Sequence, residues 1–112
     1  MNSGTDLIEM RSAVVVSQFH PDLRFLGTRI RASELREKLE VLLANATEVE
    51  IDFSGVTVSQ FFADELVGVM LLQHGPDILT RLVFKGCSNS VKDLIEFVVA
   101  DRYDEYMATR AH

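Results

Sequence analysis

The residues best suited to chemistry are three hydroxyl side chains in the loop between residues 54 and 59. Ser54, Thr57 and Ser59 lie between an apolar strand-like stretch and an apolar helical stretch. Ser59 directly precedes the helix, where serine often accepts a backbone hydrogen bond as an N-cap. It is also a candidate phosphoacceptor, because helix N-termini favour negative charge. Both interpretations of Ser59 stand, with Thr57 and Ser54 as weaker phosphoacceptors.

Three acidic residues flank this loop. Asp64 and Glu65 fall in the first turn of the predicted helix, where each carboxylate stabilises the helix dipole by about 0.3–1 kcal/mol and would repel a phosphate on Ser59. Adjacent helical residues point about 100° apart, so these two acids do not form a catalytic carboxylate pair. Asp52 lies in an otherwise apolar strand, so it either bonds loop amides near solvent or is paired inside.

Two arginines and a cysteine are the remaining candidate ligands. Arg29 and Arg31 alternate just before the first long helix and could form an anion-binding notch, although surface arginines more often pair with acids such as Glu34. Cys87, the single cysteine, is either a small buried side chain or a thiol activated by a helix N-terminus.

No set of residues predicts catalysis or metal binding. His20, His74 and His112 are far apart in sequence and lack metal-ligand spacing. No nucleophile, base and orienting group can be assembled from the polar residues. We therefore predict that the chain is not an enzyme and holds neither a metal nor a cofactor.

The composition predicts one acidic domain. Its 112 residues include 17 acids and 11 bases, for a net charge of -6, and this length can bury a core without disulfides. An acidic chain without a basic cluster is a poor ligand for a phosphate backbone, so we expect no nucleic-acid partner. No signal-peptide pattern and no membrane-length apolar run is present. We therefore expect a soluble, cytoplasmic protein without a membrane partner.

Hydrophobic periodicity predicts alternating strands and helices. We predict strands at 9–16, 23–26, 49–53 and 81–85, and helices at 33–44, 60–73 and from a Ser90–Asp93 capping box onward. Apolar stripes mark the core faces of the first and last helices: Leu35, Leu39, Leu42 and Leu43, then Val91, Leu94, Ile95, Val98 and Val99. This alternation favours an α/β layer with parallel crossovers.

The ends of the chain are less regular. Residues 1–6 are polar and predict a loose start, whereas residues 102–112 form a C-terminal extension without Gly or Pro that could continue the last helix. That helix would carry Tyr103, Tyr106 and Met107 on one side, with Phe97 off the core stripe. These side chains either form a docking surface or pack onto the domain's own sheet.

Three motifs resemble a known family. They are GTRIRA at 27–32, DFSGV at 52–56 and FADEL at 62–66. The stretch from 27 to 102 is similar to the STAS-like family of unknown function, which is related to the STAS fold of anti-sigma-factor antagonists. The resemblance implies that residues 1–112 form a single STAS-like α/β domain, with a mixed sheet of four or five strands and helices largely on one face.

The resemblance also implies a function in bacterial-type signalling. Anti-sigma-factor antagonists carry a phosphorylated serine just before the central helix, in a pattern like Asp-Ser-Ser-Gly-Leu. Here that position falls near Phe61, and Ser59 is the nearest hydroxyl. The resemblance implies a non-enzymatic regulatory module that binds a histidine-kinase-like ATPase or an anti-sigma-type protein, with Ser59 as switch or Phe61 as a constitutive apolar anchor.

The expected partner-binding residues are Val58, Phe61 and Asp64, with Tyr103 and Tyr106 as a second location. An alternative function is a small-molecule or nucleotide sensor that uses the loops at 27–31 and 54–60. The sequence also leaves open whether the chain forms a homodimer.

Overall fold

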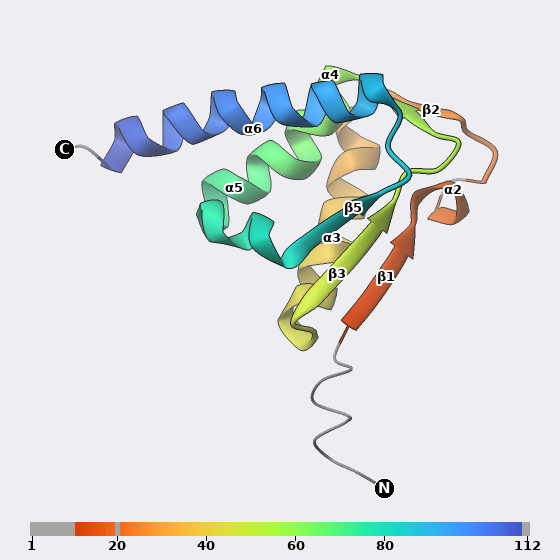
Figure 1. The fold of residues 1–112 in the computed structure, drawn as a ribbon, viewed down its shortest axis with the longest axis horizontal. Helices are drawn as coiled ribbons and strands as arrows, with labels where there is room; N and C mark the ends of the chain where they lie inside the picture. The colour runs from red at the N-terminus through yellow and green to blue at the C-terminus, as the bar shows by residue number, and fades with distance from the viewer. Residues whose placement is uncertain (1–10, 20, 111–112) are drawn as a thin grey trace, which may run out of the picture.

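Three parallel strands form the centre of the molecule (Figure 1). The computed structural model describes residues 11–19 and 21–110. In it, β1 (Arg11–Val15), β3 (Glu48–Asp52) and β5 (Leu82–Lys85) form a parallel sheet in the order β1-β3-β5. Ile51 lies opposite Val14 in one neighbour and Phe84 in the other. Paired residues of a sheet share a face, so these apolar side chains point together toward the core.

Two short strands form a separate parallel sheet. β2 (Phe25–Leu26) pairs with β4 (Thr57–Val58). The prediction of one mixed sheet of four or five strands was therefore wrong: within the described residues, five strands pair in parallel and divide into sheets of three and two. The reason is the turn after β3, where Gly55 adopts a φ of 74° and the chain leaves β3 before pairing with β2.

The helices follow the predicted order but differ in their bounds. The first long helix, α3 (Arg29–Asn45), begins four residues earlier than predicted, because Thr28 caps it by accepting the Arg31 N–H at 3.3 Å. The central helix is continuous from α4 (Gln60–Ala63) through η1 (Asp64–Gly68) to α5 (Val69–His74). It ends at Gly75, whose φ of 88° is unfavourable for other residues.

The last helix, α6 (Asn89–Arg110), is the longest element. Its N-terminal cap is Ser88, whose Oγ accepts the Val91 N–H at 3.3 Å. The predicted Ser90–Asp93 capping box was therefore displaced by two residues. The helix includes residues 102–110 of the C-terminal extension, and Figure 1 shows this end projecting beyond the sheet.

Two further short helices were not predicted. Val16 begins α2 (Val16–Phe19) instead of ending the first strand, and η2 (Pro76–Arg81) is a 3₁₀ helix that leads into β5. Residues 9 and 10 of the predicted first strand, and the predicted loose start at 1–6, lie outside the described residues.

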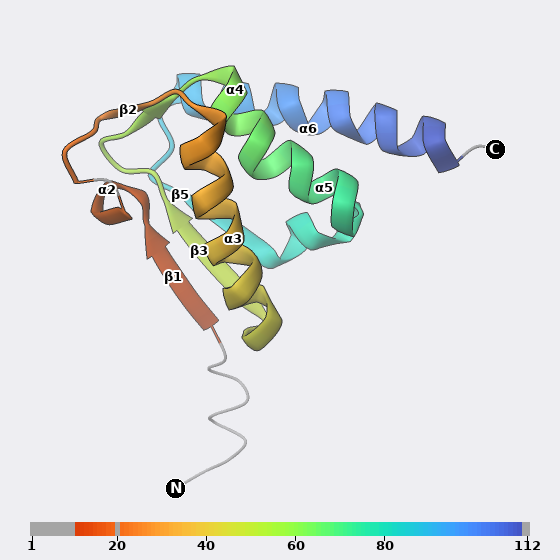
Figure 2. The same cartoon turned by 180° about the vertical axis from the view of Figure 1, so that it is seen from behind.

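The core lies between the three-stranded sheet and the helices. Figure 2 shows α3 across one face of the sheet, and the central helix packs between α3 and α6. The predicted stripes enter one common hydrophobic core, in which Leu35, Leu39, Val91 and Val98 are buried. The central helix contributes a further fully buried group: Phe62, Leu66, Met70 and Leu71.

Replacement of Leu39 by alanine tests this core. Leu39 is wholly buried, so we expect Leu39→Ala to lower the free energy of unfolding by about 2–5 kcal/mol. Val41 lies on the same helix with 64% of its surface exposed, and Val41→Ala should change stability by no more than about 0.5 kcal/mol. Urea unfolding of both variants measures the difference. Equal losses would contradict the assignment of the core face.

Candidate functional site

The central helix changes its hydrogen-bonding pattern at Asp64. Residues Asp64–Gly68 form a π-helical turn between two α-helical segments, an irregularity that occurs frequently at functional sites. A Cβ at Gly68 would lie 2.6 Å from Asp64 Oδ1 and 2.8 Å from Arg102 Cγ. Gly68 therefore lets α6 approach the central helix closely enough for these two charged side chains to meet.

Asp64 is the buried centre of an ion cluster whose two arginines are partly exposed. Its residue surface is only 8% exposed. Arg102 of α6 donates two hydrogen bonds to it, from Nε to Oδ1 and from Nη2 to Oδ2, both at 2.6 Å. Arg29 of α3 donates a third from Nη1 to Oδ2 at 2.9 Å. A bidentate arginine–carboxylate pair is strong and directional, so this cluster fixes α3, the central helix and α6 relative to one another.

The electrostatics keep all three groups charged. The hydrogen bonds from Arg102 lower the pKa of Asp64 most, and Arg29 lowers it further, against an opposing effect of burial. The same contacts raise the pKa of Arg102 and of Arg29. Asp64 is therefore ionised at neutral pH. The sequence suggested Asp64 as a helix-dipole acid and as a partner-binding residue, whereas in the structure its carboxylate is turned inward to Arg102 and Arg29 and little of it is exposed.

Glu65 extends the cluster along α3. Arg36 donates from Nη2 to Glu65 Oε2 at 3.2 Å and from Nη1 to Glu40 Oε1 at 3.3 Å. Glu40 Oε2 lies 2.8 Å from His74 Nε2 at the end of α5. Glu65, which was predicted to complement the helix dipole, therefore takes part in a network of ion pairs between α3 and the central helix.

Two exposed phenylalanines lie above the Asp64 cluster. Phe61 of the central helix is 62% exposed, and Phe97 of α6 is 56% exposed. They line one shallow groove of about 190 Å³ with Arg29 and Asp101, and the Asp64–Arg102 pair also borders it. The Arg29 guanidinium carbon lies 5.5 Å from the centre of the Phe61 ring. We call these residues, Arg29, Phe61, Phe97 and Asp101, the Phe61–Phe97 groove.

Ser59 is the N-cap of the central helix. Its Oγ accepts the Phe62 N–H at 3.0 Å and donates to the Gly27 carbonyl at 2.8 Å. The side chain thereby links the helix to the segment between β2 and α3. Addition of a phosphate would break the bond to Gly27, so this geometry favours the structural interpretation of Ser59. Val58, next to it, is 5% exposed and contributes to the core instead of to a contact surface.

The two predicted anion-binding arginines do not converge. Arg29 faces Asp64, whereas Arg31 borders a different hollow beside Pro21, Asp22 and Leu23. They are two residues apart on α3 and therefore point in different directions around the helix. The predicted notch was wrong because these residues lie inside the helix and not in an extended segment before it.

The predicted aromatic surface at the C-terminus is divided. Tyr103 and Met107 are 43% and 46% exposed. The Tyr106 ring lies against the start of η2, with its hydroxyl 3.2 Å from the position of a Cβ on Gly75. Arg110 covers this ring, with its guanidinium carbon 4.6 Å from the ring centre. Tyr106 thus packs onto the domain, and Tyr103 remains accessible.

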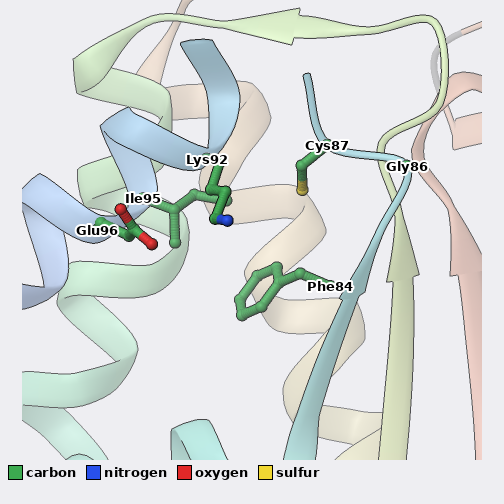
Figure 3. Close-up of a pocket in the computed structure, with 6 residues that line it drawn as sticks. All are labelled: Phe84, Gly86, Cys87, Lys92, Ile95 and Glu96. Carbon is green, nitrogen blue, oxygen red and sulfur yellow. The ribbon is translucent and has the colours of Figure 1, made fainter. Parts of the chain in front are cut away.

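A second hollow, of about 440 Å³, lies between the end of β5 and the start of α6 (Figure 3). Phe84 and Ile95 provide apolar surface, and Cys87, Lys92 and Glu96 provide polar groups. Burial, followed by the charge of Asp52, raises the pKa of the Cys87 thiol. The thiol is therefore protonated at neutral pH, which does not suit a nucleophile.

Asp52 organises the loop that follows β3. It accepts hydrogen bonds from the Ser54 hydroxyl and from the Ser54 N–H, the latter at 2.8 Å. These two bonds lower its pKa. Of the two predicted environments, the structure therefore has the loop-bonded one.

Sequence reasoning missed the role of Arg102. It follows Val98 by four residues and Ile95 by seven, so it continues the buried stripe of α6. A charged residue on such a stripe must be paired, and this was the available signal. Neither a metal-binding group of His, Cys, Asp and Glu nor a helix long and apolar enough to cross a membrane occurs within 11–19 and 21–110.

The protein is a small α/β domain with parallel sheets and a central helix that Ser59 caps. A family profile described as a STAS-like domain of unknown function matches residues 31–92, and the chain belongs to this family. Phe61, Asp64 and Glu65 lie within the matched segment, whereas Phe97 and Arg102 lie beyond it. No curated protein and no solved structure matches the chain.

Removal of the Arg102 guanidinium tests the ion cluster. Arg102→Met leaves the buried Asp64 carboxylate with Arg29 alone, and we expect a loss of about 3 kcal/mol at neutral pH. Arg110→Met, on an exposed part of the same helix, removes only the contact with the Tyr106 ring and should cost no more than about 1 kcal/mol. Urea unfolding measures both.

The stability lost in Arg102→Met should also decrease as the pH falls. The folded-state pKa of Asp64 is lowered from its ordinary value of 3.8. The ion pair therefore contributes fully above that value, and its contribution falls as the pH drops toward the lowered pKa. The difference between wild type and Arg102→Met should shrink below about pH 4. A difference that stays constant down to about pH 2 would contradict this assignment.

Proposed function

We propose that this chain is a non-enzymatic regulatory module that binds a partner protein through the Phe61–Phe97 groove. The observation that carries the proposal is the exposure of Phe61 at the N-terminus of the central helix, with 62% of its surface in contact with solvent. Large aromatic side chains concentrate binding energy in protein interfaces. Phe61 also occupies the position at which the resemblance to anti-sigma-factor antagonists expects a switch residue.

The surroundings of Phe61 hold it ready for binding. The Ser59 cap fixes the first turn of the helix, Arg29 lies over one face of the ring, and the Asp64–Arg102 pair holds the floor of the groove. A side chain whose motion is already restricted by its neighbours loses less conformational entropy on association. This favours constitutive binding over a switch that depends on phosphorylation of Ser59.

The class of partner comes from the resemblance. A histidine-kinase-like ATPase or an anti-sigma-type protein would be the corresponding partner for a STAS-like regulator. The support is the shared position on the fold and the accessible apolar anchor.

A small-molecule sensor is the second candidate, supported by the hollow beside Phe84. Ligand sites are mostly apolar with a few polar groups, and this hollow combines Phe84 and Ile95 with Lys92 and Glu96. It lies at the β5–α6 connection, and not at the loops 27–31 and 54–60 that the sequence suggested. A nucleotide or other anion would place its charge near Lys92.

Truncation of Phe61 tests the interaction. We expect Phe61→Ala to weaken binding to the partner protein by about 2 kcal/mol, or roughly 30-fold in Kd. Val41→Ala is the matched control, because Val41 is exposed to the same degree at 64% and lies on the C-terminal half of α3. Isothermal titration with the product of a neighbouring ATPase or sigma-regulator gene measures both affinities. Equal binding by the two variants, with unchanged circular dichroism, would place the interface elsewhere.

The sensor alternative has its own test. A nucleotide at about 100 times its Kd stabilises a protein by about 2.7 kcal/mol, which thermal unfolding detects readily. We expect any such stabilisation by ATP or GTP to fall in Lys92→Ala and to persist in Phe61→Ala. Absence of stabilisation by either nucleotide would exclude them as ligands of this hollow.

A further inference from the structure

We propose that the partner of the Phe61–Phe97 groove presents a basic surface, with lysine or arginine residues around an apolar side chain that contacts the two phenylalanines. This inference rests on the proposed function and specifies the chemistry of the partner. It is drawn from the distribution of charge on α6.

Three aspartates surround Phe97 on the outer face of α6. Asp93, Asp101 and Asp104 lie four residues before, four after and seven after Phe97, positions that share one face of a helix. All three are exposed. Among the ion pairs of the described residues, none involves these aspartates, whereas Glu105 of the same helix is paired with Arg102. Phe97 is thus an apolar side chain among three aspartates whose charges no ion pair of the described residues neutralises.

The basic residues of α6 lie away from this face. Arg102 is turned inward to Asp64, Lys92 borders the hollow beside Phe84, and Arg110 covers Tyr106. Arg29, the cation of the groove beside Phe61, is held by Asp64 and Glu65. The negative charge of the Phe97 face is therefore available to a partner.

Helix stability does not account for the positions of these acids. An aspartate in the first turn of a helix complements the dipole, but this effect is confined to the terminal turn, and the first turn of α6 contains no acidic residue. Asp101 and Asp104 lie in the C-terminal half of α6. An exposed phenylalanine flanked by such acids fits a partner that buries an apolar group and places cations at the rim.

The same charges disfavour other classes of partner. A phosphate backbone or an anionic lipid surface would be repelled by the three aspartates. A second acidic surface, including this face of another copy of the chain, would be repelled as well. A basic protein surface remains the complementary partner.

Site-specific photo-cross-linking identifies the partner and the segment in contact. The full chain with benzoylphenylalanine in place of Phe97 is compared with the same substitution at Val41, in lysate of the native host. Mass spectrometry then locates the attached peptide. We expect a partner segment with more lysine and arginine than aspartate and glutamate. Attachment to an acidic segment, or no cross-link above the Val41 control, would overturn the inference.

Charge reversal then tests the contribution of the rim with the purified cross-linked partner. We expect Asp101→Lys/Asp104→Lys to weaken binding at low salt by about tenfold or more, and the effect to shrink as salt rises. Glu37→Lys/Asp77→Lys changes the net charge equally at exposed positions outside the groove and should have little effect. Circular dichroism verifies that each variant is folded.

The outcomes separate this inference from the proposed function. Loss of binding in Phe61→Ala without loss in Asp101→Lys/Asp104→Lys would overturn the basic partner and leave the groove as the interface. Tighter binding by the charge-reversed variant would show an acidic partner and overturn the inference in the same way. Unchanged binding in both variants would overturn the proposed function together with the inference.

Discussion

The buried carboxylate of Asp64 is the interaction on which the arrangement of the helices depends. It receives two hydrogen bonds from Arg102 and one from Arg29, and so joins the central helix to both of its neighbours. Removing a charge from water is costly unless its hydrogen-bonding capacity is satisfied. The observed placement of α3, the central helix and α6 satisfies it with these three hydrogen bonds.

Local backbone geometry makes this contact feasible. The π-helical turn begins at Asp64, and Gly68 at its end leaves space for the Arg102 side chain. An alanine at Gly68 would bring its Cβ within 2.8 Å of Arg102 Cγ. The irregular turn, the missing side chain and the ion pair thus occur together at one contact between the central helix and α6.

The same constraint produces the surface proposed for binding. Phe61 comes from the first turn of the central helix and Phe97 from the middle of α6, and the Asp64–Arg102 pair lies between these two elements at the floor of the groove. Two aromatic side chains presented by helices along one groove differ from a loop that must order on binding. Ser59, which in the family resemblance suggests a switch, here serves the same rigidity by capping the helix and bonding Gly27.

The sequence by itself determined the order of the main elements, the core stripes and the STAS-like family. The elements and the stripes follow from local periodicity and caps, which short stretches of chain encode, and the family follows from the resemblance carried by three motifs. Leu35, Leu39 and Val91 could be assigned to the core because the apolar stripe of a helix marks the face that the helix buries. The sequence also showed that Phe97 lies off this stripe. Only the tertiary structure decided the division into two sheets, the inward turn of Asp64 and the placement of Phe61 and Phe97 along one groove. These depend on contacts between residues more than thirty positions apart, and no local pattern specifies which distant charge or ring a side chain will meet.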